Sequence, residues 1–170
     1  MNRVKGVKLS TATVADIPAM MEVERRCETA PHWTKAQYER LFSANRHAGD
    51  EYLVLVAEKD SEVQTHHEPD QQTSSMLGLL VAHRVHTDWE LENVVVKADF
   101  RRKGIASKLF GELLRHARET GSEAVFLEVR DSNDSARAAY GKWGFSEVGR
   151  RKSYYSNPIE DAVLYRFSLR

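Results

Sequence analysis

The pattern of apolar and polar positions divides the chain into four helical stretches and six strand-like ones. Ile105, Leu109, Leu113 and Ala117 recur every fourth residue, which predicts a helix over 104–120. Similar patterns, with capping residues near their ends, predict helices over 13–27, 34 to about 45, and 133–142, the last followed by Gly144 as a left-handed cap. Runs rich in β-branched residues and leucine predict strands over 51–58, 76–85, 89–96, 124–129, about 147–154 and 162–168.

The order of these elements predicts an α/β (α+β) fold. We expect a mixed, twisted sheet of about six to seven strands flanked by four helices, with residues 1–170 forming a single domain. The segment SEVQTHHEPDQQTSS, residues 61–75, is polar and contains Pro69, so it is predicted to be a loop between two neighbouring strands.

Composition narrows the function classes. The chain has 170 residues, 41% of them hydrophobic, with 25 lysine plus arginine and 25 aspartate plus glutamate. This charge balance disfavours nucleic acid as the main ligand. One cysteine, no apolar run long enough to span a bilayer and no signal-peptide pattern favour a cytoplasmic protein that binds no membrane. A monomer or weak dimer is expected.

The stretch VVVKADFRRKGIA, residues 94–106, carries a candidate anion site. A strand passes through a basic turn, Arg101 to Lys103, into a helix that opens at Gly104. Backbone N–H groups at a helix N-terminus, with added cationic side chains, can hold a pyrophosphate. Taken alone, the same pattern also fits a basic turn on a solvated surface.

Two side chains are candidates for acid–base chemistry. Glu128 lies in the apolar strand FLEV, where partial burial would suit it as a general base, but a strand-end carboxylate paired with Arg130 or Arg137 is an equal alternative. Tyr140 lies two helical turns after Asn133 and could act as a general acid. Its alternative is packing beside Trp143 and Phe145.

The segments VVVKADFRRKGIASKLF and FLEVRDSNDSARAAYGKWGF resemble the GNAT acetyltransferase superfamily over the central half of the chain. The resemblance implies the GNAT fold and acetyl-CoA as cosubstrate, with no metal. It assigns residues 101–106 to the pyrophosphate loop and implies that the backbone of Val94 and Val96, and Asn133, contact the pantetheine arm. The implied cofactor-binding residues are Val94, Val95, Val96, Arg101, Arg102, Lys103, Gly104, Ile105, Ala106 and Asn133.

Within that superfamily, LEVRxSNxxAxxxYxxxGF is similar to the signature of RimI-type ribosomal-protein-alanine N-acetyltransferases. The turn APHWT and the ending RRKSYYSNPIEDAVL also resemble that type. The resemblance implies that Glu128 is the base, that Tyr140 is the acid, and that a protein N-terminal peptide is the partner, acetylated directly in a ternary complex. The predicted substrate-binding residues are Trp33, Glu92, Asn93, Tyr154 and Tyr155, with Glu160 and Asp161 nearby in the same groove. The cofactor is expected between strands 89–96 and 124–129.

Three alternatives stay open. Glu90 and Glu92 alternate on one strand and form a rival source of the base. The acceptor could be a small amine or an amino acid, or the chain could be a non-catalytic acetyl-CoA-binding module. Cys27 on an amphipathic helix is expected to pack rather than react, and neither His66 with His67 nor His83 with His86 forms a metal site by spacing.

Overall fold

The computed structural model of this protein describes residues 6–28, 30–43, 51–60 and 75–170. Residues 61–74 of the expected polar loop, and the last residues of the helix predicted to reach Asn45, lie outside the described residues. The helices are α1 (Ile17–Arg25), α2 (Lys35–Leu41), α3 (Ile105–Glu119) and α4 (Asp134–Trp143), with short 3-10 turns η1 (Val14–Asp16) and η3 (Ala98–Phe100). The strands are β1 (Val7–Thr11), β2 (Glu51–Lys59), β3 (Met76–Val85), β4 (Asp88–Val96), β5 (Ala124–Arg130), β6 (Ser146–Ser156) and β7 (Ile159–Ser168).

The strands form one mixed sheet in the order β1-β2-β3-β4-β5-β7-β6. β4 and β5 pair in parallel, whereas β1–β2, β5–β7 and β6–β7 pair antiparallel. The prediction of a mixed sheet of six to seven strands with four helices is confirmed. β1 was not predicted. It is only five residues long, and its side chains mix valine and leucine with lysine, serine and threonine, so it carries no strong strand pattern.

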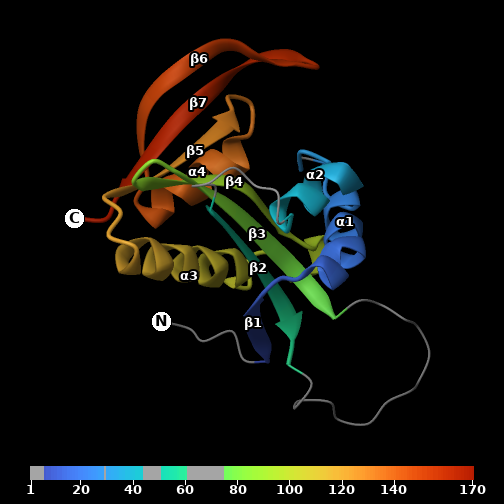
Figure 1. Ribbon diagram of the computed structural model, residues 1–170. Coiled ribbons are helices and arrows are strands. Elements are labelled where there is room, and N and C mark those ends of the chain that lie inside the picture. The colour runs from blue at the N-terminus through green and yellow to red at the C-terminus, as the bar shows by residue number, and fades with distance from the viewer. Residues whose placement is uncertain (1–5, 29, 44–50, 61–74) are drawn as a thin grey trace. The chain divides into compact units, whose positions relative to one another are not determined.

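The chain forms two compact units, and the prediction of a single domain stays a prediction. The first unit contains residues 1–81 and 93–111, and the second contains residues 82–92 and 112–170. In the first unit, α1 and α2 lie side by side (Figure 1). Its core packs α1 and α2 side chains with those of β2, β3 and β4, and includes Ile17, Met20, Val23, Tyr38, Val54, Val56, Leu79 and Val95.

A close backbone approach joins β3 to β4 in the first unit. A Cβ atom built on Gly78 would lie 2.6 Å from the carbonyl oxygen of Val95, a separation that real Cβ atoms do not show. The amide of Lys97 also donates to the carbonyl of Leu77 at 2.9 Å. Glycine at position 78 therefore lets β3 lie against the end of β4 that carries the predicted cofactor contacts.

The second unit is built on the β5-β7-β6 part of the sheet. Figure 1 shows β6 and β7 as a long, curved hairpin, and their pairing shifts register between Arg151 and Tyr155. The irregularity re-aims the side chains near the hairpin turn. Asn133 is the N-cap of α4, and its side-chain oxygen accepts from the amide of Ala136. Gly144, with φ of 94°, is the predicted left-handed cap at the other end.

Candidate active site

The predicted pyrophosphate loop, residues 101–106, leads from η3 into the N-terminus of α3 in the first unit. Gly104 has φ of 81° and Arg102 has φ of 58°. The left-handed conformation at position 104 is one that glycine adopts without a Cβ clash. Because the first N–H groups of an α-helix have no partner inside the helix, those of Ile105 and Ala106 can serve an anion.

Positive charge gathers around this loop. Burial and the neighbouring Arg26 and Lys59 lower the pKa of Lys97. The ammonium groups of Lys59 and Lys103 lie 5.5 and 4.9 Å from the ring centre of Phe100. Such a cluster of cations costs electrostatic energy unless an anion offsets it. Sequence reasoning did not name Lys59 or Lys97, because they lie outside the R-x-x-G-x-A motif.

Arg101 differs from the expectation of a side chain that simply adds charge to an exposed turn. Its Nε donates to the carbonyl of Val96 at 3.2 Å, and its Nη2 lies 3.1 Å from the sulfur of Cys27. The guanidinium therefore braces the loop against β4 and the residues after α1. Cys27 is buried, and it packs with the core as predicted.

Trp33 and Asn93, two predicted substrate-binding residues, meet at one buried carboxylate. Glu24 of α1 accepts from the amide of Trp33 at 2.8 Å and from the side-chain nitrogen of Asn93 at 2.8 Å. The hydroxyl of Tyr38 donates to the same carboxylate at 3.0 Å. Burial, followed by the Glu24 charge, raises the pKa of Tyr38. Sequence reasoning missed Glu24, since a glutamate on an amphipathic helix is usually solvated.

In the second unit, Glu92 and Glu128 lie on the neighbouring strands β4 and β5, just past their paired residues. The parallel pairing of β4 with β5 runs from Trp89 opposite Val125 to Leu91 opposite Leu127. Glu92 and Glu128 are the next residue on each strand. The predicted base and its rival therefore each come directly after the paired part of their strands.

The two carboxylates have different surroundings. Glu128, with 15% of its side chain exposed, forms an ion pair with Arg151, whose Nε lies 2.9 Å from Oε1 of Glu128. Neither expected partner holds it: Arg130 pairs with Glu160 at 3.1 Å, and Arg137 pairs with Asp131 at 2.8 Å. The alternative that named those two arginines was wrong about the partner: Arg151 lies on β6, one strand beyond β7, and its long side chain reaches across β7 to Glu128.

Glu92 lies 4.0 Å from Nδ1 of His83, measured from its Oε1. Although 29% of its side chain is exposed, burial of the rest, and then the charge of Glu90, raise the pKa of Glu92 to about 7. A carboxyl group with that pKa can take up and release a proton near neutral pH, as a general base must.

Tyr140 is buried on α4 among aromatic rings. Its ring centre lies 5.7 Å from those of both Trp143 and Phe145. This is the packing that the sequence offered as an alternative, and it holds the phenol in place whether or not the hydroxyl reacts. Burial raises the pKa of Tyr140 to about 12, so its hydroxyl stays protonated at neutral pH.

Tyr154 and Tyr155 of β6 lie near Glu128. The Glu128 carboxylate is the largest cause of the raised pKa of Tyr154, and it follows burial as a cause of the raised pKa of Tyr155. The guanidinium groups of Arg151 and Arg130 stack on these rings, at 5.3 and 4.1 Å from the centres of Tyr154 and Tyr155. Tyr154 and Tyr155 together form an aromatic rim next to the Glu128 carboxylate.

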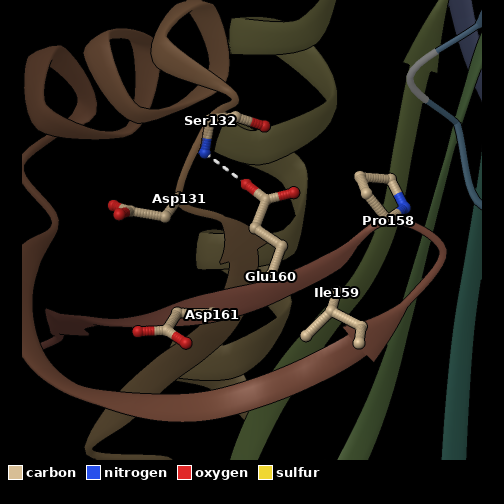
Figure 2. A pocket seen from close by; sticks show the side chains of 6 residues that line it. All are labelled: Asp131, Ser132, Pro158, Ile159, Glu160 and Asp161. Carbon is tan, nitrogen blue, oxygen red and sulfur yellow. Dashed lines mark hydrogen bonds between the residues drawn. The ribbon is translucent and has the colours of Figure 1, made fainter.

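A shallow pocket of about 400 Å³ lies at the β6–β7 turn and the end of β5, lined by Asp131, Ser132, Pro158, Ile159, Glu160 and Asp161 (Figure 2). Its carboxylates already have partners. Hydrogen bonds from Ser132 lower the pKa of Glu160, and the amide of Ser153 donates to Asp161 at 2.8 Å. Glu160 and Asp161 thus brace the hairpin that carries the tyrosines.

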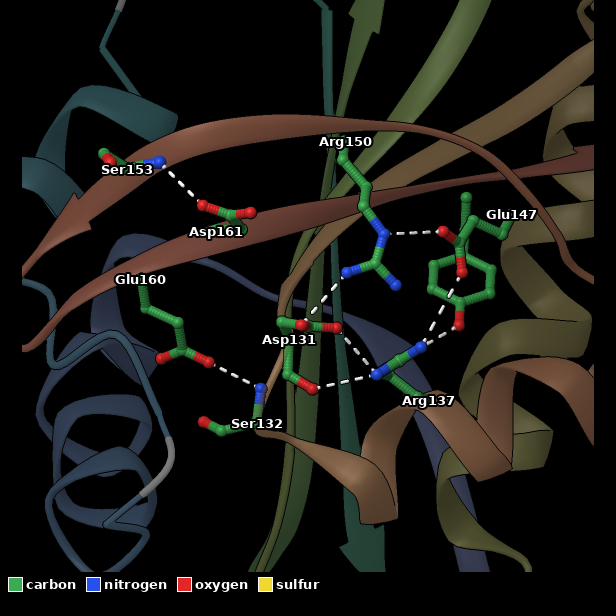
Figure 3. Close-up of polar contacts among 9 residues, drawn as sticks. Asp131, Ser132, Arg137, Glu147, Arg150, Ser153, Glu160 and Asp161 are labelled. Atoms are coloured by element: carbon green, nitrogen blue, oxygen red, sulfur yellow. Dashed lines mark hydrogen bonds and ion pairs between the residues drawn. The ribbon is translucent and has the colours of Figure 1, made fainter.

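Ion pairs attach β6 to the turn between β5 and α4 (Figure 3). Asp131 pairs with Arg137 at 2.8 Å and with Arg150 at 3.0 Å, and Arg150 also contacts Glu147 at 2.9 Å. Asn133, the predicted pantetheine contact, lies at this turn, where its side-chain oxygen caps α4. Its cap bond uses that oxygen, so the side-chain NH₂ is the group it can offer to a ligand.

Within the described ranges, no group of three or more histidine, cysteine, aspartate or glutamate side chains is arranged to hold a metal ion. His66 and His67 lie outside those ranges. Across the part of the chain that the structure describes, no helix is both long enough and apolar enough to cross a membrane.

Comparison with known proteins adds the family. Residues 17–145 match the model of the Acetyltransferase (GNAT) family. The ribosomal protein bS18-alanine N-acetyltransferase of Escherichia coli (strain K12) is 28% identical over 158 residues, covering 92% of this chain and 93% of that protein.

Two solved structures share the fold. The ribosomal-protein-S18-alanine N-acetyltransferase from Escherichia coli matches with a TM-score of 0.73 and 24% identity, covering 96% of this chain and 94% of that one. The NatC complex bound to Gag peptide and CoA matches with a TM-score of 0.73 and 15% identity, covering 97% of this chain and 99% of that one. These two likenesses bear on the fold alone.

Proposed function

The chain belongs to the GNAT family of acetyltransferases and is an acetyl-CoA-dependent N-acetyltransferase, and we propose that its acceptor is the α-amine of a protein N-terminus, namely the N-terminal alanine of a small-subunit ribosomal protein. The Escherichia coli protein that it resembles over 92% of its length is named for that reaction on bS18. The observation that carries the proposal is the position of the Glu128 carboxylate beside the tyrosines of β6, Tyr154 and Tyr155.

An α-amine suits such a site better than a lysine side chain does. Its unperturbed pKa is about 7.7–8.0, against ~10.4 for lysine, so a single carboxylate can deprotonate it at neutral pH. Tyr154 is half exposed. An aromatic rim around one carboxylate can hold the first residue of an extended peptide while the carboxylate receives its ammonium group.

The residues of the first unit fit the cosubstrate. The left-handed Gly104, the N-terminus of α3 and the cluster of Lys59, Lys97 and Lys103 offer donors and positive charge to a pyrophosphate. We propose that these groups hold the phosphates of acetyl-CoA and that the backbone of Val94, Val95 and Val96 holds its pantetheine arm. When bound, acetyl-CoA supplies the thioester from which the acetyl group is transferred.

The proposed proton transfers use one carboxylate and one phenol, in direct attack within a ternary complex. Glu128 takes a proton from the acceptor ammonium, and the hydroxyl of Tyr140 donates a proton to the departing sulfur. Glu92 is the second candidate for the base, and its pKa of about 7 favours it. The two carboxylates differ in their ion-pair partners, which are Arg151 at 2.9 Å for Glu128 and Nδ1 of His83 at 4.0 Å for Glu92.

The test is a comparison of kcat/KM for three kinds of acceptor. The first is a peptide that begins with alanine and copies the N-terminus of a small-subunit ribosomal protein. The second is the same peptide with a blocked α-amine and free lysines, and the third is a panel of small amines. We expect the first to react fastest, with the acetyl group located on the α-amine by mass spectrometry. A preference for the blocked peptide would remove the N-terminal proposal, and a preference for a small amine would favour the alternative acceptor class.

A further inference from the structure

The carboxylate of Glu24 is among the most deeply buried charged groups that the structure describes. Glu24 is 1% exposed. Its Oε2 accepts from the amide of Trp33 and the hydroxyl of Tyr38, and its Oε1 accepts from Nδ2 of Asn93. A buried carboxylate is tolerated only when donors surround it. These three donors come from three separate segments, so Glu24 joins them.

The contact with Glu24 determines how Asn93 is oriented. A carboxylate can only accept hydrogen bonds, so the amide nitrogen of Asn93 must face it. The side-chain oxygen of Asn93 is then the atom that can accept a hydrogen bond from another group. Asn93 directly follows Glu92 and precedes the β4 residues, Val94 to Val96, assigned to the pantetheine arm.

Glu24 also holds the turn that carries Trp33. The amide of Trp33 is bound 2.8 Å from Oε2, and the indole ring lies 5.5 Å from the ring of Tyr38, whose hydroxyl binds the same oxygen. Thr34, the next residue, caps α2 by accepting from the amide of Gln37. The Trp33 backbone is therefore tied to α1.

We propose that Glu24 is a positioning residue for the acceptor: it presents the side-chain oxygen of Asn93 to an N–H group of the incoming peptide and fixes Trp33 beside it. This inference rests on the proposed function, which supplies the acceptor. Glu24 itself touches no reacting atom in this scheme, and its effect on the reaction passes through Asn93 and Trp33.

The decisive variant is Glu24→Gln, which keeps the shape and changes the hydrogen-bonding pattern. Its amide oxygen can still accept from Trp33 and Tyr38, but its NH₂ then faces Asn93. Asn93 must turn its oxygen inward to accept that hydrogen bond and present NH₂ to the acceptor. We expect the acceptor KM to rise by about tenfold, with the KM for acetyl-CoA unchanged.

The double variant Glu24→Gln with Asn93→Asp separates positioning from packing. A carboxylate at position 93 accepts from the new amide with one oxygen and keeps its other oxygen for the acceptor. We expect the double variant to bring the acceptor KM most of the way back to the wild-type value. Glu22→Gln is the matched control, because Glu22 lies on the same helix and pairs with exposed Arg26 at 2.7 Å. It should retain wild-type kinetics.

Kinetics are measured with whichever amine the wild-type enzyme takes best from the three-acceptor comparison, together with the melting temperature of each variant. If that amine is not an N-terminal peptide, the proposed function fails while Glu24 is still judged on the preferred amine. A Glu24→Gln enzyme with the wild-type acceptor KM, or a double variant no better than the single one, would overturn the inference. The inference would also be overturned if the KM values for acceptor and acetyl-CoA both rose in proportion to the fall in melting temperature.

Discussion

The Nε atom of Arg151 lies 2.9 Å from the Oε1 atom of Glu128, which joins β6 to the candidate base on β5. Glu128→Gln removes both the ion pair and the base. We expect it to lower turnover by roughly 10²–10⁴-fold, the range for a lost general base, with acetyl-CoA affinity nearly intact. Rate should return at high pH, where the amine loses its proton unaided. Steady-state kinetics across pH, with calorimetry for binding, measure this.

Arg151→Gln provides the comparison for that variant, because it breaks the same ion pair and leaves the carboxylate in place. Arg151 is 55% exposed on its side chain, so its pair contributes little to stability. Its loss in turnover should be far smaller than that of Glu128→Gln. Equal losses in the two variants would mean that the ion pair, rather than proton removal, accounts for the effect.

Glu92 should make stability depend on pH. Burial and Glu90 raise the pKa of Glu92 to about 7 in the folded protein, against 4.5 as its ordinary value. Between those pH values the folded state binds more protons than the unfolded state, so the free energy of unfolding falls as pH rises. The stabilising effect of the protonated form is complete below about pH 4.5 and is lost as pH passes 7.

Glu92→Gln should lack this part of the decline. Urea denaturation at pH 5 and pH 8 measures it: the wild-type protein should lose more stability between the two pH values than the variant does. An equal loss of stability between pH 5 and pH 8 in the two proteins would contradict the raised pKa of Glu92. If the same variant also loses turnover by more than Glu128→Gln, then the base lies on β4.

Tyr140→Phe separates the hydroxyl of Tyr140 from its packing. The phenylalanine ring keeps the contacts with Trp143 and Phe145, so the melting temperature should change little. Because burial raises the pKa of Tyr140 to about 12, the hydroxyl holds its proton through the working pH range and can donate it. Turnover should fall by roughly 10²–10⁴-fold. A folded variant with normal turnover would leave Tyr140 as a packing residue alone.

The sequence predicted most elements because their patterns are local. Leu109 and Leu113 mark α3, and both are fully buried. Gly144 ends α4 in the expected left-handed conformation. β1 lacked such a signal: it is short, and its pairing with β2 stabilises it more than its own composition does.

The partners of the site residues could not be predicted, since they depend on which distant segments meet. Glu128 was expected beside Arg130 or Arg137, which are close to it in sequence. In the fold it pairs with Arg151 of β6, which lies on the far side of β7 from β5. In the helical pattern of the sequence, nothing distinguishes Glu24 from an ordinary glutamate on a helix. Only the fold shows that its donors are Trp33, Tyr38 and Asn93.

Two glycine substitutions test the close approach of β3 and β4. Gly78→Ala puts a Cβ atom 2.6 Å from the carbonyl of Val95, which must move. We expect a loss of about 1–3 kcal/mol in the free energy of unfolding. Gly111→Ala in α3 has nothing within 4 Å of the new atom and should stabilise by about 0.5–1 kcal/mol through helix propensity. Equal effects in thermal denaturation would contradict the clash.

Gly104 is the position at which the loop that we assign to pyrophosphate can be tested. Gly104 has φ of 81°, so Gly104→Val strains the backbone as well as blocking a ligand, and a loss of acetyl-CoA binding by that variant alone would be ambiguous. Gly104→Asn removes the ambiguity, because asparagine adopts the left-handed conformation more readily than other residues while still carrying a Cβ.

Both variants should weaken acetyl-CoA binding by about 10–100-fold, which corresponds to the loss of one hydrogen bond to a charged group. Only Gly104→Val should also lower the melting temperature clearly. Calorimetric titration with acetyl-CoA, beside thermal denaturation, distinguishes the two effects. If Gly104→Asn binds with wild-type affinity, the backbone at position 104 does not approach the pyrophosphate. The N–H groups at the N-terminus of α3 and the cations Lys59, Lys97 and Lys103 would then remain as candidates for holding it.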